Sequence, residues 1–83
     1  MPLYMDVHTI DDGVAIDDVT QAHLADLRTQ EAYDVRYLRY WVNEARGKIF
    51  CLVEAPSVEA ANTVHREAHG LVADDLFEVQ EGL

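Results

Sequence analysis

The feature that most limits how this chain can fold is an unbroken apolar run, Ile49-Phe50-Cys51-Leu52-Val53. Successive side chains of a strand point to opposite faces of a sheet, so this run predicts a central strand that is covered on both faces. Ala45-Arg46-Gly47, just before it, favours a tight turn, and Val35–Glu44 is rich in aromatic and β-branched residues. We therefore predict a hairpin in which Val35–Glu44 pairs with Lys48–Ala55.

The N-terminal half of the chain predicts a strand followed by a helix. Leu3–Ile10 is strand-like and ends at Asp11-Asp12-Gly13, which is a typical turn sequence. Asp17 is the expected N-cap of a helix that runs to about Gln30, because a carboxylate there accepts free backbone N–H groups and suits the helix dipole. With the first strand of the hairpin, this half has the order strand, helix, strand.

The second half repeats that order. Ser57 is the expected N-cap of a second helix, Gly70 is its expected C-cap, and Leu76–Gln80 predicts a short last strand. A chain of 83 residues is long enough for one domain, residues 1–83, and too short for two. The order predicts an α+β fold, the ferredoxin-like β-α-β-β-α-β sandwich, in which two helices lie on one face of a four-stranded antiparallel sheet.

Such a sheet has a second face that no helix covers. Both faces of the strand at residues 35–44 are predicted to carry large apolar side chains. One face has Val35, Tyr37, Arg39 and Trp41, and the other has Arg36, Leu38, Tyr40 and Val42. A sheet that is apolar on both faces and has helices on one needs another cover. We therefore expect a homodimer formed through the open face.

The charge of the chain excludes two classes of partner. Six basic residues against sixteen acidic ones give a formal net charge of −10, which repels nucleic acid and anionic membrane surfaces. No apolar run approaches the roughly 20 residues that span a bilayer, and Met1–Asp6 lacks the features of a signal peptide. Cys51 is the only cysteine, so no intrachain disulfide can form. These features predict a cytoplasmic protein.

The strongest local signal for chemistry is a pair of histidines on the second predicted helix. His65 and His69 are four residues apart, so their imidazoles lie on the same side of the helix and can approach one metal ion. A zinc protease helix would need Glu directly after the first His, where Arg66 stands, and the reversed motif would need Glu at Ala68. The pair is therefore a candidate metal site without protease chemistry. The alternative is two histidines at the edge of a helix that bind nothing.

A second candidate lies on the first predicted strand. Asp6 and His8 are two residues apart, so they point to the same face and place a carboxylate beside an imidazole. Met5 and Val7 point the other way and are predicted to lie in the core. The alternative is that Asp6 and His8 belong to an exposed polar face.

The third candidate is on the first predicted helix. His23 falls within the apolar stripe that should face the sheet, and Asp26 lies near the edge of that stripe. A carboxylate that hydrogen-bonds an imidazole is the usual arrangement behind a metal-bound histidine. The alternative is a buried neutral histidine with one hydrogen bond.

Together these residues favour a transition metal. Imidazole and carboxylate donors suit Ni²⁺, with Zn²⁺, Cu²⁺ and Co²⁺ as the other candidates, better than Ca²⁺ or Mg²⁺. The predicted ligands are His65, His69, His8 and His23, with Asp6, Asp26 and Glu67 as supporting carboxylates. Cys51 is predicted to be a buried core thiol, because its neighbours are apolar.

Five segments also carry a resemblance to a known family. They are Met5–His8, Ala22–Leu27, Tyr37–Trp41, Phe50–Pro56 and Val64–Leu71. Over essentially the whole chain, the sequence resembles the small ferredoxin-like proteins of actinobacteria that are described as nickel-binding or as a domain of unknown function. The resemblance implies a ferredoxin-like homodimer that binds nickel for sequestration or detoxification. The ligand choices above rest on spacing and not on the resemblance.

Three functional hypotheses follow. The first is a metal-binding protein without catalytic activity. The second is a small dimeric enzyme of tautomerase, isomerase or monooxygenase type, with His23 and Asp26 as the base, or with Pro2 as an N-terminal secondary amine after removal of Met1. The third is a ligand-sensing or interaction module that binds no metal.

Overall fold

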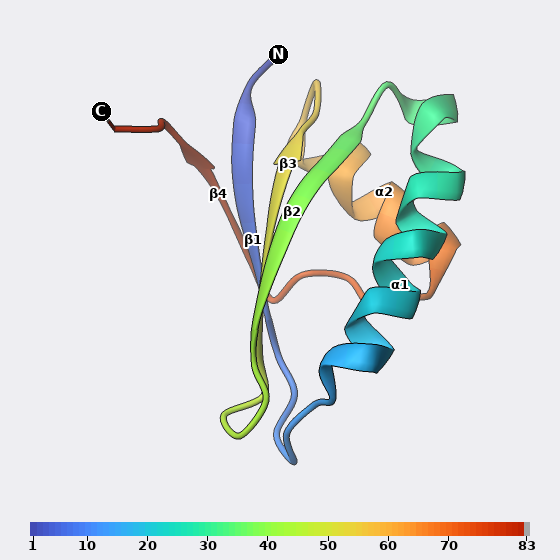
Figure 1. The fold of residues 1–83 in the computed structure, drawn as a ribbon. Coiled ribbons are helices and arrows are strands. Elements are labelled where there is room, and N and C mark those ends of the chain that lie inside the picture. Colours follow the sequence, from blue (N-terminus) through green and yellow to red (C-terminus); the bar gives the residue numbers. More distant parts are fainter. Residues whose placement is uncertain (83) are drawn as a thin grey trace.

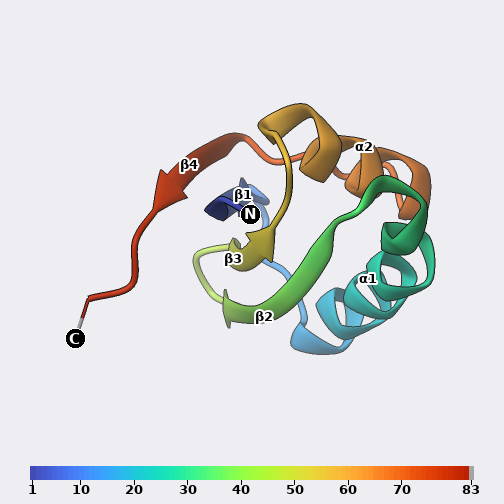
Figure 2. The ribbon, with the colours of Figure 1, turned by 90° about the horizontal axis from the view of Figure 1, so that it is seen from above.

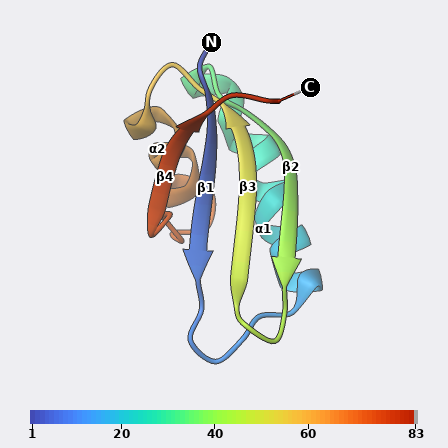
Figure 3. The ribbon, with the colours of Figure 1, turned by 90° about the vertical axis from the view of Figure 1, so that its left-hand side faces the viewer.

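The structure is a computed structural model that describes residues 1–82, and its elements follow the predicted order (Figure 1). They are β1 (Leu3–Thr9), α1 (Ile16–Thr29), the 3₁₀ helix η1 (Gln30–Tyr33), β2 (Arg36–Asn43), β3 (Lys48–Glu54), α2 (Val58–Ala68) and β4 (Asp75–Val79). All strand pairs are antiparallel, and the strand order across the sheet is β2-β3-β1-β4 (Figure 3). The β2–β3 hairpin and the central position of β3 are confirmed.

Both helices lie on one face of the sheet, which leaves the other face open within residues 1–82 (Figures 1 and 2). Neither helix is long and apolar enough to cross a membrane. The core between helices and sheet contains mainly aliphatic and aromatic side chains. It consists of Tyr4, Val19, Val35, Tyr37, Ile49, Cys51, Val53, Ala55, Ala61 and Val64.

The helix ends agree only partly with the predictions. Ser57 caps α2 as predicted, because its side chain accepts the N–H of Ala60. The prediction for α1 is wrong, since Ala15 is the N-cap and makes no side-chain hydrogen bond. Glu44, from the end of the β2–β3 hairpin, supplies the missing acceptor: its Oε2 is 2.8 Å from the N of Ile16. A tertiary contact therefore takes the place of a local cap.

Strand β1 presents the opposite face to the helices from the one predicted. Tyr4, Asp6 and His8 are buried under the helices, while Met5 and Val7 lie on the open face and are half-buried. The prediction that Met5 and Val7 form the core is therefore wrong. The alternation itself is correct, but it cannot indicate which face the helices cover.

Strand β2 contains a bulge that breaks the predicted alternation. The register with β3 shifts between Tyr37 and Arg39. Tyr37 and Tyr40 therefore both face the helices, and Trp41 faces the open side, 47% exposed. An extra residue in one strand moves all later side chains to the other face. The predicted faces of β2 are wrong beyond Tyr37.

Gly47 in the β2–β3 turn is required by two features at once. Its φ is +65°, and its carbonyl oxygen accepts the N–H of Ile10 at 2.8 Å. A Cβ placed on Gly47 would collide with the backbone carbonyl of Ile10. The turn and the end of β1 can therefore approach this closely only because position 47 has no side chain.

We predict that Gly47→Ala lowers the free energy of unfolding by about 2–4 kcal/mol, because it adds a backbone collision to the cost of positive φ. Gly70→Ala is the matched control, since Gly70 has φ of +84° and open space where a Cβ would lie. It should lose only about 1 kcal/mol. Urea unfolding of both variants measures the difference, and equal losses would show that the collision is relieved.

Candidate metal centre

Four ionisable side chains meet beneath the helices and are almost completely buried. Asp6 and His8 come from β1, Asp26 from α1 and His65 from α2, and their exposed fractions are 0%, 2%, 2% and 1%. The two-residue period of the strand points Asp6 and His8 up toward the helices, where α2 brings His65 down to them. A fully buried group of this kind has to satisfy its charges internally.

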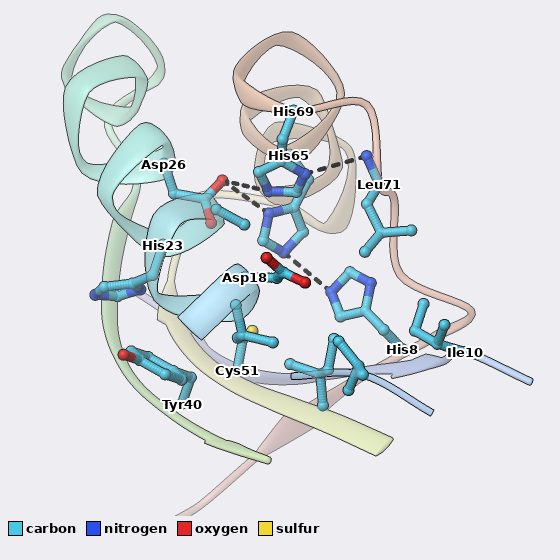
Figure 4. Close-up of a pocket in the computed structure, with 14 residues that line it drawn as sticks. His8, Ile10, Asp18, His23, Asp26, Tyr40, Cys51, His65, His69 and Leu71 are labelled. Atoms are coloured by element: carbon cyan, nitrogen blue, oxygen red, sulfur yellow. Dashed lines mark hydrogen bonds and ion pairs between the residues drawn. The ribbon is translucent and has the colours of Figure 1, made fainter. Parts of the chain in front are cut away.

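His65 is at the centre of this group and contacts a carboxylate through each ring nitrogen. Figure 4 shows its contact with Asp26. Its Nδ1 is 2.9 Å from Oδ1 of Asp26, and its Nε2 is 2.9 Å from Oδ2 of Asp6. Burial by itself would lower the pKa of His65. The hydrogen bonds to Asp26 and Asp6 outweigh burial and raise that pKa to about 9. Without a metal, His65 is therefore an imidazolium at neutral pH.

The two carboxylates are correspondingly held in the charged form. Burial alone would raise the pKa of Asp6, but the hydrogen bond from His65 and the close approach of His8 bring it well below its usual value. The pKa of Asp26 is also lowered, because its hydrogen bonds to His65 and His69 outweigh burial. The hydroxyl of Tyr37 is 3.0 Å from Oδ2 of Asp6 and adds a neutral donor on that side.

The other oxygen of Asp6 lacks a hydrogen-bond partner within residues 1–82. Nε2 of His8 is 3.2 Å from this Oδ1, which is ion-pair distance, but the contact does not have hydrogen-bond geometry. The same Nε2 is 3.3 Å from Nε2 of His65, whose proton is already directed at Asp6 Oδ2. No placement of protons gives Oδ1 of Asp6 and Nε2 of His8 good hydrogen bonds while His65 keeps its bond to Oδ2 of Asp6. A cation between Asp6, His8 and His65 would serve them together.

His69 belongs to the outer part of the cluster. Its Nε2 is 3.1 Å from Oδ1 of Asp26, and its Nδ1 accepts the backbone N–H of Leu71 at 3.1 Å. Because Nδ1 is an acceptor, Nε2 carries the ring proton and donates it to Asp26. Asp26, His65 and His69 form one group whose ligand atoms lie within 4.8 Å of one another.

Cys51 is a candidate ligand that sequence reasoning assigned to the core alone. It pairs with Asp6 in the sheet register, and its sulfur belongs to a second group with Asp6, His8 and His65, again within 4.8 Å. Burial and the negative charge of Asp6 raise the pKa of the thiol, so it is protonated without a metal. The cross-strand pairing with Asp6 is the signal that places it here, and a single sequence does not reveal that register.

The remaining predicted ligands lie elsewhere. His23 is half-buried with its ring centroid 4.7 Å from that of Tyr40, and it belongs to neither group of candidate ligands. Its expected partner Asp26 hydrogen-bonds His65 and His69 instead. Glu67 is exposed and accepts the hydroxyl of Tyr33, on a different side of α2 from His65. Five of the seven predicted residues therefore come together, and His23 and Glu67 do not.

The donor set suits a transition metal of intermediate hardness. A carboxylate oxygen and two imidazoles are offered by Asp6, His8 and His65, and Asp26 stands behind His65. A carboxylate that accepts the second ring N–H of a ligating histidine fixes the orientation of that ring. The residues present therefore fit a divalent ion such as Ni²⁺, Zn²⁺, Cu²⁺ or Co²⁺.

Comparison with known proteins agrees with this class. The sequence profile of the nickel responsive protein SCO4226-like family matches residues 4–79. The crystal structure of SCO4226 from Streptomyces coelicolor A3(2) is similar at a TM-score of 0.89 and 40% sequence identity, covering 98% of this chain and 99% of that chain. A search of curated protein sequences finds no match. This chain belongs to the nickel responsive protein SCO4226-like family.

We predict that the metal-free protein loses stability as the pH rises from about 6.5 to about 9. The raised pKa of His65 means that the folded state binds a proton more tightly than the unfolded state. This contribution is fully present below about pH 6.5 and is lost as the pH approaches about 9, and its full size is about 3 kcal/mol.

Urea unfolding with a chelator present, across this pH range, measures the effect against His65→Gln, which lacks the titrating group. The wild type should lose about 3 kcal/mol more than the variant. If the free energy of unfolding changes with pH by the same amount in both proteins, the assignment of a charged His65 is contradicted.

Proposed function

We propose that this protein binds a divalent transition metal ion, nickel before the others, and holds it for sequestration or detoxification. The observation that carries the proposal is the buried Oδ1 of Asp6, a carboxylate oxygen without a hydrogen-bond partner in the described residues, which lies beside two imidazoles. The proposed ligand atoms are this oxygen, Nε2 of His8 and Nε2 of His65.

The surrounding residues support this assignment. With a metal ion bound, Nε2 of His65 would be deprotonated and act as a ligand, while Nδ1–H would continue to donate to Asp26. His69 holds Asp26 from the other side. The thiol of Cys51 is a fourth candidate donor, because a bound metal ion can deprotonate a coordinating thiol.

The preference for nickel rests on the family. Its description is nickel responsive, and the donor set suits nickel without distinguishing it strongly from Zn²⁺, Cu²⁺ or Co²⁺. A protein that holds the ion among buried side chains is suited to storage. We also place this protein in the cytoplasm, where its single cysteine stays reduced.

We predict that the wild type binds Ni²⁺ and that His8→Ala weakens this binding at least about tenfold, because one of three ligands is removed. Asp26→Asn should weaken it by about 10–100-fold by releasing the orientation of His65. Isothermal titration at neutral pH measures both effects.

His23→Ala is the matched control, since it removes an imidazole that lies outside the ligand groups. It should retain wild-type affinity. If His23→Ala loses nickel and His8→Ala does not, the site is elsewhere. If the wild type shows no nickel binding, the proposed function is wrong.

We also propose that the fold is of the ferredoxin-like kind and that two copies pair through the open sheet face. The strand order β2-β3-β1-β4 and the position of both helices on one face support the first statement. Exposed apolar side chains on the open face support the second: Trp41 is 47% exposed, Phe77 is 54% exposed and Leu38 is 38% exposed. A hollow on this face is lined by Leu3, Met5, Leu38, Trp41, Leu52 and Val79, among others.

We predict that the wild type has twice the monomer mass of 9.4 kDa in sedimentation equilibrium and that Trp41→Glu has the monomer mass. The new carboxylate would be buried without a partner in the dimer. Leu24→Glu is the matched control, because Leu24 is 40% exposed on α1, away from the sheet face. A monomeric wild type, or a monomeric Leu24→Glu, would contradict this interface.

A further inference from the structure

A cavity of about 150 Å³ lies directly beside the candidate metal centre, between α1, the sheet and the connection from α2 to β4 (Figure 4). Its walls are mainly apolar and include Ile10, Val14, Val19, Ile49 and Leu71. An apolar cavity of this volume is large enough for a molecule the size of benzene. The metal-binding proposal does not use this space.

The cavity borders the candidate metal centre on the side of its two imidazoles and the thiol. His8, His65 and Cys51 line it, whereas Asp6 does not and lies behind them. An ion held by Asp6, His8 and His65 would therefore lie beside the cavity.

The cavity also has a route to solvent. Asp18 near the start of α1 is exposed, Leu71 after α2 is 39% exposed, and both line the space. A small molecule can therefore enter the cavity without unfolding the helix layer. Larger molecules are excluded by the volume.

Charge and shape restrict the class of molecule that fits. Asp18 and Asp26 line the cavity, and the chain has a net charge of −10, so anions are disfavoured. The rings of His23 and Tyr40 form part of the wall and favour a flat ring. The free side of a nickel-like ion requires a lone pair, and a neutral ring nitrogen matches its intermediate hardness.

We propose that this cavity binds a small neutral nitrogen heterocycle, of the imidazole or pyridine class, whose ring nitrogen coordinates the bound metal. This inference rests on the proposed function, because it requires an ion held by Asp6, His8 and His65. It adds a ligand site and a ligand class, and it makes the metal centre open on one side.

The test uses protein loaded with Co²⁺, whose visible absorption responds to each change of ligand, and imidazole as the probe. Ala22 lines the cavity from α1, so Ala22→Leu fills the space, while Gln21→Leu adds the same side chain at an exposed neighbouring position. Val14→Phe fills the cavity from the loop before α1 and is the second variant if Ala22→Leu folds poorly. The affinity of each variant for Co²⁺ is measured first.

We expect wild type and Gln21→Leu to bind imidazole with the same affinity and a shifted absorption band, and to retain their Co²⁺ after desalting. Ala22→Leu and Val14→Phe should keep their Co²⁺ affinity and bind imidazole at least about tenfold more weakly. Unchanged imidazole affinity in both filled variants, or no band shift in loaded wild type, would overturn the cavity proposal alone. Failure of the wild type to take up Co²⁺ or Ni²⁺ would overturn it together with the proposed function.

Discussion

The two hydrogen bonds of His65 connect the three elements that form the site, β1, α1 and α2. Through Asp26 the ring is joined to α1, through Asp6 it is joined to β1, and its own backbone belongs to α2. Two negative charges and one positive charge are thereby placed where almost no water reaches them. Such a group is stable only while each member keeps its partners, and removal of one member of a buried pair typically costs about 3–5 kcal/mol. The position of the helices on the sheet therefore depends on this contact.

Apolar residues of similar volume would fill the same space at less cost in desolvation. The cluster also leaves Asp6 Oδ1 and His8 Nδ1 without partners in the described residues, so stability alone does not account for it. A metal ion would account for the cost of the cluster and for the free Oδ1 of Asp6, because it needs deprotonated donors, and the carboxylates are held ionised in advance. Under the proposed function, the proton on Nε2 of His65 is what a metal ion would displace.

Much of this arrangement follows from local sequence patterns. The order of elements, the β2–β3 hairpin and the cap at Ser57 depend on neighbouring residues, and all are confirmed. The side-by-side placement of Asp6 and His8 follows from the two-residue period of a strand in the same way. What local patterns cannot supply is a contact between distant segments.

The features that the sequence does not predict all depend on contacts between distant segments. The face of β1 that the helices cover, the bulge beside Leu38 and the cap that Glu44 provides for α1 depend on tertiary packing. Spacing on α1 predicts Asp26 as the partner of His23, but Asp26 bonds His65 of α2 and His69 just after that helix. Helical spacing predicts which residues share a helix face, and it does not predict what the facing helix presents.

The central claim is that the ion lies inside the protein and not on its acidic surface. Crystals of the nickel-loaded protein, measured at the nickel absorption edge, locate the ion directly by its anomalous scattering. We expect a peak between Asp6, His8 and His65, with Asp26 still bonded to Nδ1 of His65. Peaks found only at exposed carboxylates or at His23, with Asp6 and His65 still joined as in the metal-free structure, would contradict it.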